Sequence, residues 1–252
     1  MKIFKTFICA IYICFVLVSC NRNIPEILIT PDSGITTENK WWILTHTSYQ
    51  NPGIFLYNET TATIELELKL PDNLESPHAL AFDGTSLWVG GNGENESLYQ
   101  LNPETGDILS EIKNINTEGI AIQDNYIFYS NLNTINKIER NGTFIEAIET
   151  QNTALNISDI AINNNTLYYL RYSETAPIVK LNLTTKSETP INNIETSGTY
   201  CLSFFENKLI TVSALNEIAY NSSLTGVISV HTTGIEGWIT AIAPYYEITE
   251  ED

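Results

Sequence analysis

The side chains best suited to chemistry stand singly, next to short apolar segments that recur along the chain. Glu118 directly precedes Gly119-Ile120, and Asp159 opens a similar segment, so the two could form a carboxylate pair for acid/base work. His78 precedes another such segment and could assist with proton transfer. One hypothesis is therefore a hydrolase, lyase or acyl transferase in which Glu118 is the general acid/base.

The same positions also favour a second hypothesis, in which the protein binds a partner without catalysis. Polar or partly polar residues precede five recurrent segments, and further polar and aromatic residues belong to loops expected at the same end of the fold. The candidate ligand-binding residues are His78, Glu118, Ser158, Asp159, Tyr200, Trp238, Thr240, His46 and Asn92. Their acidic, amide and aromatic character suits a protein, peptide or glycan better than a phosphate. The alternative is that they satisfy only loop backbone and each other.

Metal and cofactor motifs are scarce. The chain has three histidines with no His-x-x-x-His pair and no group of thiolate ligands, so a zinc site is not expected. Gly90-Gly91-Asn92-Gly93 lies between two expected strands and opens no helix, so it is not a phosphate-binding loop. We expect no cofactor, and leave open Ca²⁺ held by carboxylates and carbonyls of a central channel.

A repeat of about forty residues indicates which elements position these side chains. Five segments alternate small and apolar residues, and their third residues are 40, 40, 42 and 40 positions apart. The third residues are Ala81, Ala121, Ala161, Ser203 and Ala243. After each of the first four come a turn, an apolar-aromatic strand and two further strands, which is the unit of a β-propeller blade.

The two ends of the chain complement each other. Only one strand follows the last turn, in Trp238–Ile248, whereas three strands without an inner partner are expected within 41–70. Joining them hides two sheet edges. The sequence therefore predicts an all-β fold, a β-propeller of five four-stranded antiparallel blades, closed by the C-terminal strand joining the N-terminal blade. A β-sandwich with coincidental spacing is the alternative.

The first twenty residues have the features of an export signal. Two lysines precede the uncharged apolar run Phe7–Val18, which is too short to span a bilayer as a helix. Leu17-Val18-Ser19-Cys20 resembles the lipobox of bacterial lipoproteins, in which the cysteine is lipidated. This resemblance implies an envelope protein anchored through Cys20, and the absence of Asp after Cys20 favours the outer membrane. An ordinary secretory signal is the alternative.

These observations divide the chain into four parts. They are a signal peptide (1–19), a lipidated tether (20–40), the propeller (41–248) and an acidic tail (249–252). Cleavage after residue 19 would remove two lysines and no carboxylate, so the net charge would change from −18 to −20. Such a charge repels phosphate backbones, and nucleic acid is not an expected partner. Cys201 would be the remaining thiol, expected as a buried core residue.

Two family resemblances accompany these patterns. The repeats, as in Glu118-Gly119-Ile120-Ala121-Ile122, are similar to those of YncE-like and NHL propellers, which implies blades but no particular site. Thr117-Glu118-Gly119-Ile120 resembles a motif of plant-type glutamine cyclotransferases, which implies a catalytic role for Glu118. The chain departs from that family where His78 and Ser158 replace a glutamine and an asparagine, so the resemblance implies a shared fold more than a shared activity.

Overall fold

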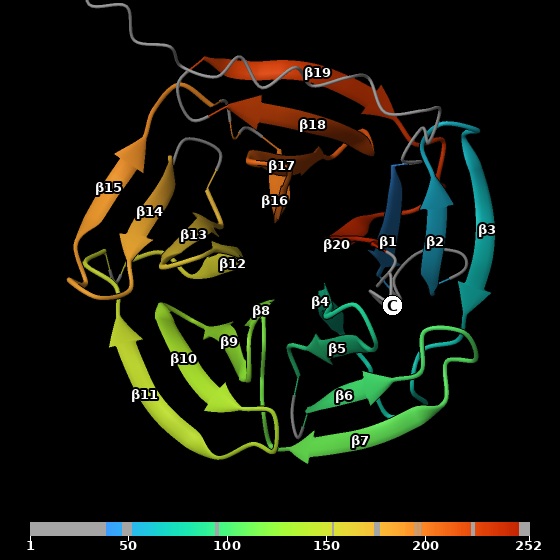
Figure 1. The fold of residues 1–252 in the computed structure, drawn as a ribbon, viewed down its shortest axis with the longest axis horizontal. Coiled ribbons are helices and arrows are strands. Elements are labelled where there is room, and N and C mark those ends of the chain that lie inside the picture. The colour runs from blue at the N-terminus through green and yellow to red at the C-terminus, as the bar shows by residue number, and fades with distance from the viewer. Residues whose placement is uncertain are drawn as a thin grey trace, which may run out of the picture. The chain divides into compact units, whose positions relative to one another are not determined.

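The protein forms five separate four-stranded antiparallel sheets around a common axis, which confirms the predicted five-bladed propeller and excludes the β-sandwich (Figure 1). The computed structural model describes residues 39–46, 52–93, 96–152, 154–173, 177–194, 196, 198–222 and 225–246. The predicted signal peptide, Cys20, the tether up to residue 38 and the acidic tail lie outside the described residues. No helix occurs in the described ranges, and hence none that could cross a membrane.

Each blade is a sheet of four strands, which follow one another from the axis outward. Blade 1 is β20 (Ile239–Pro244), β1 (Lys40–Thr45), β2 (Ile54–Asn58) and β3 (Thr63–Leu68), and blade 2 is β4 (Pro77–Phe82), β5 (Leu87–Gly91), β6 (Ser97–Leu101) and β7 (Ile108–Lys113). Blade 3 is β8 (Gly119–Gln123), β9 (Tyr126–Asn131), β10 (Thr134–Glu139) and β11 (Phe144–Glu149). Blade 4 is β12 (Ile157–Asn163), β13 (Thr166–Arg171), β14 (Ile178–Asn182) and β15 (Glu188–Ile191). Blade 5 is β16 (Thr199–Phe205), β17 (Lys208–Ser213), β18 (Glu217–Ser222) and β19 (Gly226–Thr232).

The recurrent small residues lie on the five inner strands, where the blades converge. Ala81, Ala121 and Ala161 are all buried, and three consecutive residues of each inner strand line a narrow central cavity of about 140 Å³. Small side chains let the inner strands approach the axis without collision. Because each blade has one inner strand, these small residues recur about every forty positions.

Hydrophobic packing is divided among the blade interfaces. There are five clusters of buried apolar side chains, and each joins two neighbouring blades. Between blades 1 and 2, for example, Trp42 and Leu44 pack with Leu80 and Phe82. Because each blade contributes to two clusters, stability depends on an unbroken ring.

The ring closes through pairing of the chain ends, as predicted. β20 pairs antiparallel with β1, with Ala243 opposite Trp42, and the amide of Tyr245 donates to the carbonyl of Lys40 at 2.9 Å. The last strand thus supplies the inner strand that β1 to β3 lack.

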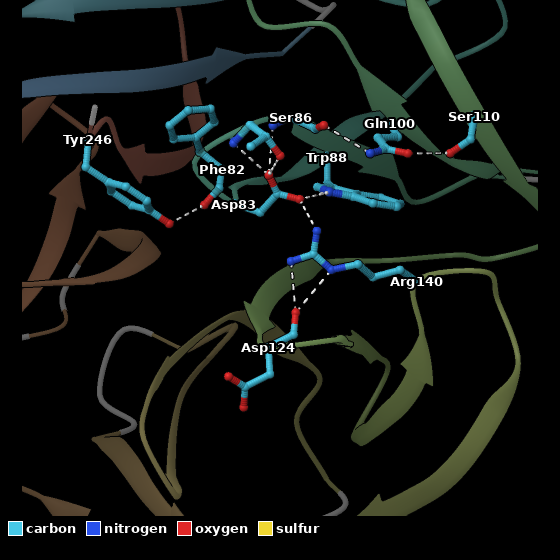
Figure 2. Close-up of polar contacts among 10 residues, drawn as sticks. Phe82, Asp83, Ser86, Trp88, Gln100, Ser110, Asp124, Arg140 and Tyr246 are labelled. Carbon is cyan, nitrogen blue, oxygen red and sulfur yellow. Dashed lines mark hydrogen bonds and ion pairs between the residues drawn. The ribbon is translucent and has the colours of Figure 1, made fainter. Parts of the chain in front are cut away.

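A polar network joins blades 2 and 3 at the end of the propeller where the inner strands finish (Figure 2). The buried Asp83 carboxylate accepts a hydrogen bond from the Trp88 indole at 2.9 Å and forms an ion pair with Arg140. Arg140 also donates to the carbonyl of Asp124, and Tyr246 donates to the carbonyl of Phe82. We name this end the lower face, and the end where the inner strands begin the upper face.

Candidate functional site

The candidate residues before the small segments are positioned by breaks in strand pairing. His78, Ser158, Tyr200 and Thr240 are each the extra residue of a β-bulge, skipped in the register between an inner strand and its neighbour. Glu118 stands at the equivalent place in blade 3, where its amide donates to the carbonyl of Ser130, the residue opposite Gly119. A bulge turns a side chain away from the regular alternation of the strand. One residue per blade is thereby placed at the upper face, at a bulge in four blades and at the equivalent place in blade 3.

A second set of residues follows the second strand of each blade. In four blades the first residue of this loop donates its amide to a backbone carbonyl two residues before the bulge residue. These bonds join His46 to Trp238, Asn92 to Ser76, Tyr172 to Asn156 and Ala214 to Gly198. The repeated bond fixes the loop beside the start of the inner strand, and it explains why His46 and Asn92 lie near the bulge residues.

Five side chains, one from each blade, form a closed ring of contacts, which we call the upper ring. The Tyr172 hydroxyl donates to Glu118 at 2.8 Å, and the Tyr172 and Tyr200 rings lie 6.1 Å apart between centroids. Trp238 follows at 5.7 Å from Tyr200 and 6.4 Å from His78. The circuit ends at Glu118, whose carboxylate lies 4.0 Å from Nδ1 of His78.

His46 and Asn92 support this ring from the neighbouring loops. The His46 ring lies 5.4 Å from that of His78 and 5.6 Å from that of Trp238. The Asn92 side-chain amide donates to the second oxygen of Glu118. The ring therefore combines one carboxylate, one amide and several aromatic faces.

Glu118 is the electrostatic centre of the upper ring. It is only 4% exposed, and burial raises the pKa of its carboxyl, although the Tyr172 hydrogen bond opposes this shift. Burial, together with the neighbouring His46, lowers the pKa of His78 to about 4. His78 is thus neutral near pH 7 and supplies no positive charge to Glu118.

Asp159 lies within the wall of the propeller, near enough to Glu118 for the two carboxyls to interact electrostatically, but it takes no part in the ring of contacts. It is buried, and its two carboxylate oxygens accept hydrogen bonds from the amides of Ile160 and Leu202, at 2.8 and 2.7 Å. Burial raises the pKa of Asp159 well above its usual value. These two bonds act in the opposite direction, and the neighbouring Glu118 carboxyl adds to the rise. The side chain ties the inner strands β12 and β16 together.

Ser158 and Thr240 occupy bulge positions but are small and buried. Thr240 donates to the carbonyl of Leu44 at 3.4 Å, whereas Ser158 Oγ has no hydrogen-bond partner in the described part of the chain. In blades 4 and 1 the larger Tyr172 and Trp238 take part in the ring instead. Tyr172 is the residue that sequence reasoning missed, and its signal was its position directly after the second strand, equivalent to His46 and Asn92.

An open depression adjoins the ring on the upper face. It has a volume of about 410 Å³ and is lined by Tyr200, Trp238, Ala214 and Gly237. Two ring residues thus present aromatic surface to a space large enough for part of a ligand.

Metal ligands and thiols contribute little to this site. No group of three His, Cys, Asp or Glu residues that could hold a metal is found among the described residues. Cys201 is buried, as expected from its apolar surroundings, and its thiol donates to the carbonyl of Ile239 at 3.2 Å.

Comparison with known proteins supports the fold alone. No family model and no curated protein matches the chain. A solved protein of unknown function from Bacteroides caccae is 14% identical, with a TM-score of 0.53 over 84% of this chain and 100% of that one. Hydrazine synthase of Kuenenia stuttgartiensis is also 14% identical over 64% of this chain, with a TM-score of 0.45, and the match spans about half of that chain (50%). At 14% identity, the likeness to the Bacteroides caccae protein shows a similar fold and nothing about function.

Proposed function

We propose that the protein is an envelope-anchored lipoprotein that binds a protein, peptide or glycan partner at the upper face of its propeller. The observation that carries the proposal is the upper ring, to which every blade contributes one side chain, beside a depression of about 410 Å³. Aromatic surface with a few polar groups is typical of binding sites that use stacking for affinity and hydrogen bonds for orientation.

The environment of Glu118 favours binding over catalysis. A general acid/base must reach the proton that it transfers. The Glu118 carboxyl is 4% exposed, and Asn92 and Tyr172 occupy its two oxygens. Asp159, the other carboxylate considered for acid/base work, is held by two backbone amides. We therefore assign Glu118 a role in shaping and charging the site, and Asp159 a role in joining two strands.

Glycan and peptide panels probed with the purified protein test the binding proposal. The wild type is compared with Tyr200→Ala and Trp238→Ala, which remove aromatic surface from the depression. A matched control, Tyr246→Ala, removes an aromatic side chain from the lower face. We expect the recognised ligands to be lost in both upper-face variants and retained in the control. Ligands that tolerate both upper-face changes but need Tyr246 would contradict the proposal.

Metabolic labelling with a palmitate analogue tests the anchor. We expect wild-type protein in bacterial cells to be labelled and to fractionate with the outer membrane. Cys20→Ser should abolish labelling, because it removes the thiol that would carry the lipid. Cys201→Ser is the control and should be labelled normally, because Cys201 is buried. Labelling that survives Cys20→Ser would refute the anchor.

A further inference from the structure

The upper ring presents aromatic faces in an arrangement suited to a cation. Tyr200 and Trp238 meet at an interplanar angle of 77°, and both line the depression. Both side chains are partly exposed. A cation within about 6 Å of an aromatic centroid is attracted by the negative face of the ring. An apolar ligand would use the same area without this attraction.

The one carboxylate of the upper ring contacts Tyr172 and His78, which separate it from Tyr200 and Trp238, and it has no cationic partner among the described residues. The two oxygens of Glu118 accept hydrogen bonds from Asn92 and Tyr172, an arrangement that an ionised carboxylate accommodates with both oxygens as acceptors. Its nearest ionisable neighbour of opposite type is His78, at 4.0 Å, which is neutral near pH 7. A buried carboxylate without a counter-charge favours a positively charged ligand nearby.

The charge of the surrounding loops has the same sign. In the described parts of the connections at the upper end, between the second and third strands or leading into an inner strand, there is no arginine, and the acidic residues besides Glu118 are Asp72, Glu75, Glu96 and Glu236. Their one lysine, Lys69, is already paired with Asp72 at 2.5 Å. This excess of negative charge attracts cations and repels anions within the screening length set by the salt concentration.

We propose that the upper ring and its depression bind an organic ammonium group, which packs on Trp238 and Tyr200 and is attracted by Glu118. The inference rests on the proposed function, because it names the chemistry of the ligand that the upper face takes. A neutral sugar would use the aromatic faces but would leave the Glu118 charge without a counter-charge. An inorganic cation would gain little from the two aromatic rings.

Two probes that differ only in charge test this chemistry. Choline carries a quaternary ammonium, and 3,3-dimethylbutan-1-ol is its neutral isostere. We expect calorimetric titration of the purified protein to show at least tenfold tighter binding of choline. Added sodium chloride should weaken choline binding, because salt screens the attraction. Equal affinity for these two probes, together with equal affinity for the lysine probe and its neutral counterpart described below, would overturn the inference.

Three variants locate the binding. Trp238→Leu should weaken choline binding about fivefold or more, the order expected for loss of one cation–π contact. Glu118→Gln keeps the shape of the side chain, removes the charge and should weaken binding to a similar extent. Tyr246→Leu, on the lower face, should leave it unchanged. Circular dichroism confirms the fold of each variant, and choline binding that is unaffected in both upper-face variants would overturn the inference.

A second pair of probes identifies the source of the ammonium. The N-acetyl-lysine and N-acetyl-norleucine methylamides differ in the terminal amine, so preference for the first indicates a lysine side chain of a peptide, and preference for choline alone indicates a small quaternary ammonium. Failure of both cationic probes would overturn the inference. The proposed function would still stand if ligands from the panels depended on Tyr200 and Trp238, so the two failures are distinguishable.

Discussion

Residues of the same chemical type have different roles in this propeller because their surroundings differ. Glu118 and Asp159 follow similar sequence patterns in neighbouring blades. The first meets side-chain donors at the upper ring, and the second meets two backbone amides inside the wall. The sequence indicated that both belong near the start of an inner strand. It could not indicate which carboxylate would point toward backbone, because that depends on strand pairing: Asp159 is a paired residue within β12, whereas Glu118 precedes β8.

Position along the repeat is enough to bring six of the candidate residues together. His78, Glu118, Tyr200 and Trp238 come together, with His46 and Asn92 beside them. Size and packing decide the remaining positions, so Ser158 and Thr240 are buried and Tyr172 completes the ring. Whether any of these residues contacts a ligand stays a prediction.

His78 makes the stability of the protein sensitive to mild acid. Its pKa is about 4 in the folded protein, against 6.5 as the ordinary value, so the unfolded state binds its proton first as the pH falls. The free energy of unfolding should therefore decrease from pH 6.5 downward, by a total on the order of 3 kcal/mol near pH 4. Urea unfolding at pH 7 and pH 4.5 measures this loss.

The matched control is His78→Asn, which cannot titrate. Glu118 and Asp159 act in the opposite direction, because burial raises their pKa values, and His46 acts in the same direction as His78. All three remain in the variant, so the difference between the two proteins reports His78 together with its interaction with His46. We expect the wild type to lose more stability than His78→Asn between the two pH values. An equal loss would contradict the assignment.

At the scale of strands, the site depends on β-bulges, which the sequence repeat does not indicate. The sequence predicted strand order and the small residues of the inner strands, because these follow from periodicity and steric crowding. It did not predict the four bulges at His78, Ser158, Tyr200 and Thr240, since a bulge changes pairing without a distinct residue signature. The bulges at the start of the inner strands direct side chains such as His78 and Tyr200 toward the upper ring.

Gly119 tests how closely two inner strands must approach. A Cβ added there would lie 2.4 Å from Oδ1 of Asp159 and 2.7 Å from both the Asp159 Cα and the Ile160 nitrogen, so backbone of β12 would have to move. We expect Gly119→Ala to lower the free energy of unfolding by about 1–3 kcal/mol. Chemical denaturation measures the loss.

Gly53→Ala is the comparison for that variant. Its added Cβ would lie 3.2 Å from the Phe55 ring, a side chain that can shift. The loss of stability should therefore be smaller than at Gly119. A Gly119→Ala protein as stable as the wild type would show that the inner strands can separate without cost.

At the scale of the whole molecule, closure of the ring was the most predictable feature. The five recurrent segments indicated the number of blades, and the missing strand at one end matched the extra strand at the other. The five apolar clusters between blades make this closure a condition of stability, since opening one interface exposes a complete cluster.

Removal of β20 should abolish cooperative folding. A chain ending at Gly237 lacks the inner strand of blade 1 and the buried Ile239, Ala241 and Ile242, which pack in the clusters on both sides of that blade. We expect no cooperative thermal transition by circular dichroism, whereas a chain ending at Tyr246 should unfold like the full protein.

A circular permutant separates closure from chain length. Residues 40 and 245 are already joined by a backbone hydrogen bond, so a short Gly/Ser linker can connect the ends, with new termini in the exposed turn at Glu104. We expect this permutant to fold and to melt within several degrees of the wild type. A permutant that fails to fold while the chain ending at Gly237 folds would contradict the closed ring.

If the ligand binds at the upper ring, the four tryptophans should respond to it differently. Trp238 belongs to the ring, whereas Trp41, Trp42 and Trp88 are buried in the clusters between blades. The measurement is a ¹H–¹⁵N spectrum of the four indole groups during titration with choline and with each ligand that the panels identify. We expect a saturable shift of the Trp238 resonance, with the other three unchanged. Saturable binding that leaves Trp238 unshifted would contradict it.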